Sequence, residues 1–366
     1  MQSKKKPTIG TVAEAAGVAV STVSRYLNGH SVSAPVRARL SEVIATLGYS
    51  RSWTARNLSL GRRGCIGVIV DLSEDPWFVQ LLTGIEEELS ARDTSLMLAS
   101  LELKGRYDPG RVFEWIRDHR VDGLIVAKSQ RRERSLFGAA IDARLPIVAV
   151  APDETVMHVQ MLRCNNVAAG MLVADHLVEL GHQHIAFGAG LEHAIDSKHR
   201  LRGVRERLQQ HGLNLDPKDV FSCGSWDVAA GRQFAERFFA MPAPHATAVV
   251  LANDALAIGF MRVAQKIGVK MPDDLSVVGF DGLPQGGLQW PALTTVAQPM
   301  REMGRVACRC LFEVIEDPGR QEKIEFPMEL VMRESTGPGP FQKTRRPPGM
   351  RLVSLDRPPD SSSEAE

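Results

Sequence analysis

A hydroxyl-rich segment with one arginine, VSTVSRYLNGH at residues 20–30, carries side chains suited to contacts with nucleic acid. Arg25 can donate two parallel hydrogen bonds to the edge of a guanine, whereas Val20 can offer only methyl groups, for instance to a thymine. The hydroxyl, amide and imidazole groups of the segment can reach phosphate oxygens. The candidate DNA contacts are Val20, Ser21, Thr22, Ser24, Arg25, Asn28 and His30.

Three short helices are needed to position these side chains, and residues 9–49 predict them. The first is expected around 11–16, the second begins near Ser21 and closes at Asn28, and the third begins at Ser33. In a helix-turn-helix the second helix enters the major groove, and small or apolar residues hold it against the first. The residues at these packing positions are Ala13, Gly17, Val18 and Val23. Because other three-helix bundles contain similar spacings, a plain bundle stays open as an alternative.

Charge is distributed unevenly along the chain. Residues 1–64 carry ten Lys and Arg residues against two Glu residues, which is +8 with neutral histidine, although the whole chain carries only +1. The remaining residues therefore carry −7. A basic N-terminal segment on a mildly acidic body indicates that the segment, and not the body, meets phosphate.

Beyond residue 64, apolar runs that predict buried strands alternate with helical stretches. The runs are CIGVIVDL, SLMLASL, DGLIVAK, PIVAVAP, HIAFGAG, TAVVLAN and LSVVGFDG. Such strands are typical of parallel α/β sheets covered by helices on both faces, and their number suits two sheets. Ligands of these sheets bind at the carboxyl ends of the strands. Asp281 follows the last run, so its carboxylate is expected at that edge.

Composition bounds the class of protein. Five scattered cysteines without a Cys-x-x-Cys pair predict reduced thiols. No apolar run approaches the ~20 residues of a membrane-spanning helix, and no signal-peptide core follows the N-terminus. We therefore expect a soluble cytoplasmic protein with no membrane partner. Residues 339–366, rich in Pro, Arg and Ser, are expected to form a disordered tail.

Ordered motifs along the chain resemble those of the lac repressor/purine repressor family of transcriptional regulators. They are VAEAAGV at 12–18, TVSR at 22–25, LNG at 27–29, LGY at 47–49, ARNL at 55–58, IGV at 66–68, PWF at 76–78, HLVELGHQHIAF at 176–187, RLRG at 200–203, ANDALAIG at 252–259, GFDG at 279–282, PALTTVAQP at 291–299 and MREST at 332–336. The resemblance covers about residues 8–338. It implies an N-terminal all-α helix-turn-helix head and a two-lobed α/β body like a periplasmic binding protein, with parallel sheets and three crossovers.

The resemblance also implies domain boundaries and a second DNA contact. The expected parts are 8–50 for the helix-turn-helix domain, 51–64 for a hinge, and 65–338 for a body that binds ligand and dimerises. One lobe would take 65–164 and 298–323, and the other 165–294 and 324–338. In the family the hinge folds into a helix on the operator. There Leu58 would insert between base steps in the minor groove, and Arg56 would neutralise phosphate.

For the body, the resemblance places seven side chains at the cleft between the lobes. The aromatic rings among these side chains can sandwich a sugar-like face, and the polar groups can bind hydroxyls or an acidic group. The seven are Trp77, Phe78, Asp196, Arg200, Trp226, Asn253 and Asp281. Relatives that bind purine carry an arginine where Ala194 stands and a threonine where Asp196 stands, and Ala151 replaces a residue that commonly touches sugar hydroxyls. A sugar or sugar-derived metabolite is the expected small-molecule effector.

Plain structural interpretations of these residues stay open beside the functional one. Trp226 could be a core residue, Asn253 could cap the following helix, and Arg200 could be an exposed member of a basic stretch. A constitutive DNA binder that ignores small molecules is a second alternative.

The third alternative is an α/β enzyme with an attached DNA-binding head. Gly188 and Gly190 are similar to part of a dinucleotide loop, but His193 occupies the third glycine position. The His and Cys pairs of the chain do not have the arrangement of a metal site. We therefore expect no catalysis and no cofactor. The expected protein is a homodimeric repressor of a pseudopalindromic double-stranded DNA operator, controlled by a small molecule.

Overall fold

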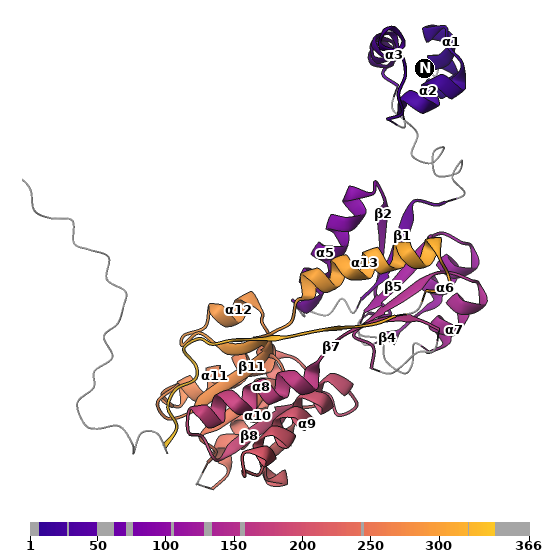
Figure 1. Cartoon of the computed structure of the whole chain (residues 1–366). Helices are drawn as coiled ribbons and strands as arrows, with labels where there is room; N and C mark the ends of the chain where they lie inside the picture. The colour runs from indigo at the N-terminus through magenta and orange to yellow at the C-terminus, as the bar shows by residue number, and fades with distance from the viewer. Residues whose placement is uncertain are drawn as a thin grey trace, which may run out of the picture. The chain divides into compact units, whose positions relative to one another are not determined.

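The computed structural model describes residues 7–27, 29–49, 62–70, 76–103, 106–127, 134–153, 158–242, 245–320 and 322–340. Contacts divide the chain into two compact units, Met1–Cys65 and Ile66–Glu366, and Figure 1 labels many of their elements. Most of the expected hinge and most of the expected tail lie outside the described residues.

The N-terminal unit contains three helices, α1 (Ile9–Ala16), α2 (Val20–Leu27) and α3 (Ala34–Leu47), as the sequence predicts. Helix α1 begins two residues before its expected start, because the side chain of Thr8 accepts a hydrogen bond from the backbone of Thr11 and caps the helix. At Gly17 the backbone turns with φ +63°, which favours glycine. The buried core residues of this unit are Val12, Ala13, Ala16, Val23 and Leu40.

The first sheet of the body has the strand order β13-β7-β6-β5-β1-β2. Its strands are β1 (Cys65–Ile69), β2 (Ser95–Ala99), β5 (Gly123–Ala127), β6 (Ile147–Val150), β7 (Gln160–Cys164) and β13 (Lys323–Phe326). Helices α5 (Trp77–Ala91) and α13 (Met300–Glu316) pack side by side on it. Helices α6 (Gly110–Arg117) and α7 (Arg134–Asp142) form a second pair, and a small sheet joins β3 (Glu102–Leu103) to β4 (Arg106–Tyr107).

The second sheet has the order β14-β12-β11-β10-β8-β9, with β14 antiparallel to β12 and the other pairs parallel. Its strands are β8 (Ile185–Ala189), β9 (Val220–Ser222), β10 (Ala248–Leu251), β11 (Ser276–Asp281), β12 (Thr294–Ala297) and β14 (Glu329–Val331). Helices α8 (Asn166–Glu179) and α9 (Ile195–Gln210) form one packed pair, and α10 (Val228–Ala240) and α11 (Asp254–Lys266) form another. A 3-10 helix at Pro217–Asp219 and the short α12 (Pro284–Gly287) complete this lobe.

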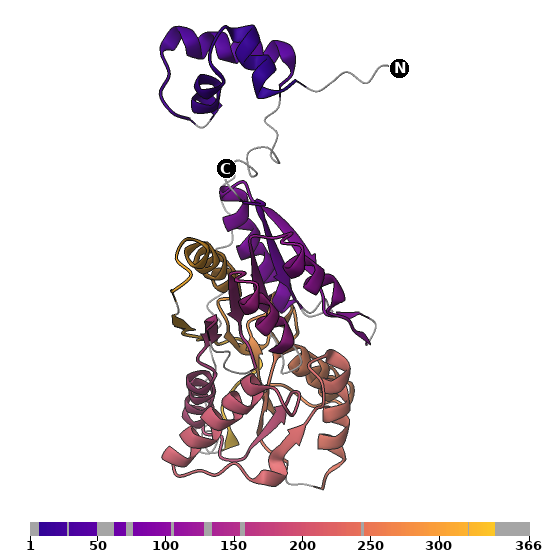
Figure 2. The same ribbon diagram turned by 90° about the vertical axis from the view of Figure 1, so that its right-hand side faces the viewer.

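The chain passes between the two sheets three times, after β7, after β12 and after β13, as expected (Figure 2). One boundary differs from the expectation, because the third crossover lies after Phe326 and not after residue 323. The reason is strand pairing: β13 runs parallel to β7 from Lys323 beside Met161 to Phe326 beside Cys164. These backbone hydrogen bonds hold residues 323–326 in the first sheet. The predicted fold class is otherwise confirmed.

The first residue of the expected tail, Gly339, is part of the described structure. The backbone N–H of Gly339 donates to the carbonyl of Leu180 at 2.7 Å, so the chain is still packed on the second lobe at that residue. In the described ranges, no helix combines the length and the apolar character that crossing a membrane would require.

A close approach of two helices determines where the polar residues of α9 lie. A Cβ on Gly170 of α8 would come 2.2 Å from the carbonyl oxygen of Arg200, and one on Gly203 of α9 would come 2.0 Å from that of Val167. Only glycine allows this distance between the backbones. The pair therefore brings the start of α9 against the start of α8, where the polar network of the body forms.

Candidate functional site

The exposed face of α2 carries the side chains expected to contact base edges. Val20, Ser21 and Arg25 are exposed, while Val23 on the opposite face is fully buried. Arg25 donates from Nη2 to the carbonyl of Ser31 at 3.3 Å, an exposed contact that leaves most of its donors available. Thr22 and Ser24 are half-buried and His30 is exposed. The other expected DNA contacts, Asn28, Arg56 and Leu58, lie outside the described residues.

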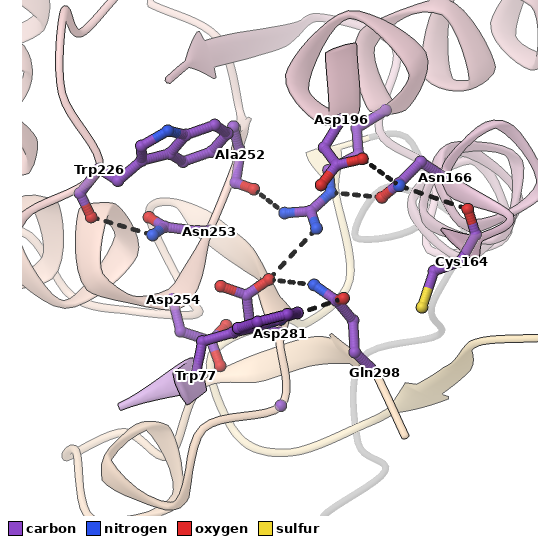
Figure 3. A network of polar contacts seen from close by, with 12 residues as sticks. Trp77, Cys164, Asn166, Asp196, Trp226, Ala252, Asn253, Asp254, Asp281 and Gln298 are labelled. Carbon is purple, nitrogen blue, oxygen red and sulfur yellow. Dashed lines mark hydrogen bonds and ion pairs between the residues drawn. The ribbon is translucent and has the colours of Figure 1, made fainter. Parts of the chain in front are cut away.

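In the body, the centre of the candidate site is a buried pair, Arg200 of α9 and Asp281 of β11. Figure 3 labels Asp281 and the residues around the pair. Nη2 of Arg200 donates to Oδ1 of Asp281 at 3.2 Å, and each side chain is 3% exposed. Arg200 also donates from Nε to Asn166 Oδ1 at 2.8 Å and from Nη1 to the carbonyl of Ala252. Its guanidinium stacks on the ring of Phe280, 4.8 Å from the centroid. Arg200 is therefore the buried centre of a polar network and not an exposed member of a basic stretch.

Asp281 sits in an unusual position for a charged residue. It ends β11 with φ +107°, a conformation that residues with a side chain rarely adopt. Besides Arg200, it accepts a hydrogen bond from Nε2 of Gln298 at 2.5 Å. The sequence alone does not reveal that Arg200 pairs with Asp281, because the two residues are 81 positions apart.

Two members of the network, Gln298 and Asn166, escaped the sequence analysis. Gln298, at the second crossover, accepts a hydrogen bond from Nε1 of Trp77 at 3.2 Å while it donates to Asp281. Asn166 donates from Nδ2 to Oδ1 of Asp196 at 2.8 Å. Gln298 directly follows β12 and Asn166 begins α8 two residues after the end of β7, so both lie where the chain crosses between the sheets. This position was the available signal. Through Gln298, a side chain of the first lobe is joined to the charged pair of the second.

The expected aromatic residues lie in two different places. Trp77 is fully buried and Phe78 is 4% exposed, and their rings meet edge to face with centroids 5.1 Å apart. Trp226, before α10, is half-buried and packs against the backbone of Gly190, where a Cβ would come 2.5 Å from the indole ring. Trp226 is thus the more accessible of the two tryptophans.

Asn253 has the structural role that was left open as an alternative. Its Oδ1 accepts from the backbone N–H of Leu256 at 2.9 Å and caps α11, and its Nδ2 donates to the carbonyl of Trp226 at 2.9 Å. Because both ends of the amide are used, Asn253 holds the segment that carries the indole.

A second buried carboxylate, Asp254, lies next to Asp281. Burial raises the pKa of Asp254 to about 8, and the negative charge of Asp281 acts in the same direction. The hydroxyl of Thr295 donates to it at 2.6 Å and the backbone N–H of Leu283 at 2.7 Å, and both bonds oppose the shift. Asp254 therefore anchors the chain segment directly after Asp281.

The described residues give no sign of metal or redox chemistry. Among them, no cluster of three or more His, Cys, Asp or Glu side chains is placed to hold a metal ion. All five cysteines are free, and burial raises the pKa of Cys164, Cys223 and Cys308 to about 12, which keeps their thiols protonated. What the network offers is directional hydrogen bonding by charged and amide groups beside an indole ring.

Known proteins match both parts of the chain. Residues 8–52 match the profile described as bacterial regulatory proteins, lacI family, and residues 174–336 match a periplasmic binding protein-like domain. The HTH-type transcriptional regulator DegA of Bacillus subtilis is 30% identical over 340 residues, 91% of this chain and 99% of that protein. The HTH-type transcriptional repressor PurR of Mannheimia succiniciproducens is 30% identical over 90% of this chain and 98% of its own length.

Solved structures agree with these matches. The lac repressor dimer bound to operator and the anti-inducer ONPF superposes with a TM-score of 0.77 at 26% identity, and the match covers 91% of this chain and all of that one. The complex of the transcriptional regulator CelR with cellobiose gives a TM-score of 0.68 at 27% identity over 90% of this chain and 99% of that one. The helix-turn-helix unit, the two-lobed body and the full-length relatives lead to one assignment. The chain belongs to the lacI family of bacterial regulatory proteins, which are DNA-binding transcriptional regulators and not enzymes.

Proposed function

We propose that this regulator is a homodimeric repressor that binds a pseudopalindromic operator and senses a sugar or sugar-derived metabolite between its lobes. The observation that carries the ligand part is the buried Arg200–Asp281 pair with Asn166, Asp196 and Gln298 around it. Fixed charged and amide groups of this kind can recognise several hydroxyls at once, because their positions are set before the ligand arrives.

Three features support a sugar as the effector. Trp226 is half-buried beside the polar network and offers an apolar face, which suits the C–H face of a sugar ring. The CelR structure contains cellobiose, and a lacI-family regulator from Enterococcus faecium, with a TM-score of 0.67 and 25% identity, contains ribose. Ala194 and Asp196, which stand where purine-binding relatives carry arginine and threonine, disfavour a purine.

The proposed ligand contacts are six of the seven expected side chains together with Asn166 and Gln298, while Asn253 holds the segment that carries Trp226. Closure of the lobes around the effector would act on the Trp77–Gln298–Asp281 chain, since that chain joins the two lobes. A change in lobe position would then alter the spacing of the two hinges in a dimer and the affinity for DNA. By linkage, DNA must alter the affinity for the effector by the same factor.

The proposed DNA contacts follow from the exposed face of α2. Arg25 would read a guanine, and Val20 would contact a neighbouring methyl group. Arg62 and Arg63, exposed at the end of the expected hinge, would neutralise phosphates, and Leu58 would insert into the minor groove. The +8 charge of residues 1–64 supports this orientation of the protein on DNA.

Thermal unfolding of the full chain against a panel of compounds tests the ligand part. The panel contains cellobiose, ribose, glucose and hypoxanthine. A sugar at one hundred times its Kd should stabilise the protein by about 2.7 kcal/mol, because it binds only the folded state. Asp196→Asn should reduce the shift.

The same panel separates the alternatives. A shift with hypoxanthine alone would contradict the sugar proposal. A complete lack of response to an extended metabolite panel would favour a constitutive DNA binder.

A further inference from the structure

Two nitrogen atoms of the Arg163 guanidinium are buried, and nothing in the described parts of the chain accepts a hydrogen bond from them. Arg163 precedes Cys164 at the end of β7, beside the first crossover between the lobes. Its Nε and Nη2 atoms are buried and have no hydrogen-bond partner, although the residue as a whole is half-buried. Buried donors of this kind are rare in folded proteins, and each one calls for a physical explanation.

The carboxylate nearest to Arg163 in the strand register binds another residue. Glu325 of β13 is the register neighbour of Arg163 on the adjacent parallel strand. Its Oε2 accepts a hydrogen bond from Nδ2 of Asn165 at 2.8 Å instead. An intrachain ion pair across the two strands therefore does not account for Arg163.

The missing partner must supply both acceptor atoms and negative charge. A neutral hydroxyl could accept from Nε or Nη2, but it would not compensate the positive charge of this partly buried guanidinium. A carboxylate or phosphate group offers two oxygens in the geometry that matches the guanidinium fork. The chemistry of the vacant donors thus favours an anionic oxygen group.

His199 of α9 stands near the same guanidinium. Burial lowers the pKa of His199, the positive charges of Arg163 and Arg202 act in the same direction, and Asp196 opposes them. The imidazole is therefore neutral at pH 7 and keeps one N–H that can donate to an anion. Arg163, Arg202 and Asp196 all lie close enough for their charges to act on His199.

Arg163 also adjoins the site already described. His199 responds to the charges of both Arg163 and Asp196, so the guanidinium lies near a member of that network. Asn166, three residues after Arg163, contacts both Arg200 and Asp196. A group bound at Arg163 would therefore belong to a molecule that also reaches the polar network.

We propose that Arg163 and His199 form a subsite for an anionic group of the effector, which narrows the effector to a sugar acid or a phosphorylated sugar. The subsite rests on the proposed sensing function and refines it. A sugar acid and a phosphorylated sugar share the same chemistry here, because each offers negatively charged oxygens to the guanidinium of Arg163.

The test uses the full chain and small anions, so that no knowledge of the effector is needed. The Tm is measured with increasing inorganic phosphate or sodium acetate against sodium chloride at equal ionic strength. The variants are Arg163→Met and, as a matched control, Arg117→Met, since Arg117 is an exposed arginine of α6. A saturable rise in Tm is expected for the natural sequence and for Arg117→Met, and none for Arg163→Met.

In chloride alone, Arg163→Met should raise the Tm by about 2–4 °C, because methionine fills a similar volume without an unsatisfied charge. A larger response to phosphate would assign a phosphorylated ligand, and a larger response to acetate a carboxylate. The proposal is overturned if neither anion acts beyond chloride, if Arg163→Met responds like the natural sequence, or if it melts lower in chloride. Operator binding and responses to neutral sugars are read separately, so this failure would leave the proposed function standing.

Discussion

Asp281→Asn should destabilise the body, because it removes the charge that neutralises a buried arginine. In the folded protein Oδ1 of Asp281 accepts from Arg200 at 3.2 Å and from Gln298 at 2.5 Å, and only 3% of either charged side chain is exposed. Asparagine keeps one acceptor oxygen and tolerates the positive φ of this position. The substitution therefore isolates the loss of charge from changes in shape or backbone.

The expected size follows from the two bonds. A hydrogen bond to a charged group contributes about 1.5–3 kcal/mol, and loss of one partner of a buried ion pair costs about 3–5 kcal/mol. Since one acceptor oxygen remains, we expect about 3 kcal/mol. At roughly 2–4 °C per kcal/mol for domains of 150–250 residues, the Tm should fall by at least about 6 °C.

The assay is thermal and urea unfolding of the full chain without added ligand. Asp216→Asn is the matched control, since Asp216 forms an exposed pair with Lys218 and its loss should shift the Tm far less. The double variant Arg200→Met with Asp281→Asn should recover part of the stability, because it leaves no unpaired buried charge. If Asp281→Asn unfolded like the natural sequence, the view of Arg200 and Asp281 as a mutually dependent buried pair would be wrong.

Further predictions concern both units. Arg25→Ala should relax the preference for one operator base pair by about 1–3 kcal/mol in a competition assay, and a uniform loss over all sequences would exclude base readout. Leu58→Ala should bend operator DNA less in a circularisation assay, and unchanged bending would remove it from the minor groove. The natural protein should lose stability as pH rises from about 4 to 8, because the pKa of Asp254 is higher in the folded than in the unfolded protein, and Asp254→Asn should abolish this loss. If urea unfolding gave the two proteins the same dependence of stability on pH, the raised pKa would be wrong. Gly190→Ala should displace the Trp226 indole and change its fluorescence, whereas an unchanged spectrum would contradict the tight contact.

The sequence predicts the fold well where local signals are strong. The seven apolar runs all became strands, since near-continuous Val, Ile and Leu segments are stable only inside a covered sheet. Strands β7, β9, β12, β13 and β14 of the two large sheets were missed. In β7 and β13, polar residues such as Arg163 and Glu325 interrupt the apolar pattern. The same polar pattern explains why the third crossover was placed three residues too early.

The candidate site was predictable as a set of residues but not as a network. Motif resemblance located Arg200 and Asp281, yet their pairing joins residues from distant parts of the chain and depends on the close packing of α8 and α9. Asn253 shows the opposite case, because a helix-capping signal is local and its capping role could be anticipated. Gln298 gave only a weak signal, since its role depends on Trp77 of the other lobe.

The most direct test of a ligand-responsive regulator is the Kd for DNA in the presence and absence of effector. DNA retained by the full chain from its own genome supplies the operator, and a shuffled duplex of equal length is the control. At physiological salt the operator should bind about 10³-fold or more tightly than the control, with log K falling linearly as log salt rises. The sugar that raises the Tm should change the operator Kd by about 5–150-fold and leave the control unchanged. Equal affinity for both duplexes, or an operator Kd that the bound sugar does not alter, would contradict the assignment of this chain as a sugar-controlled operator-binding repressor.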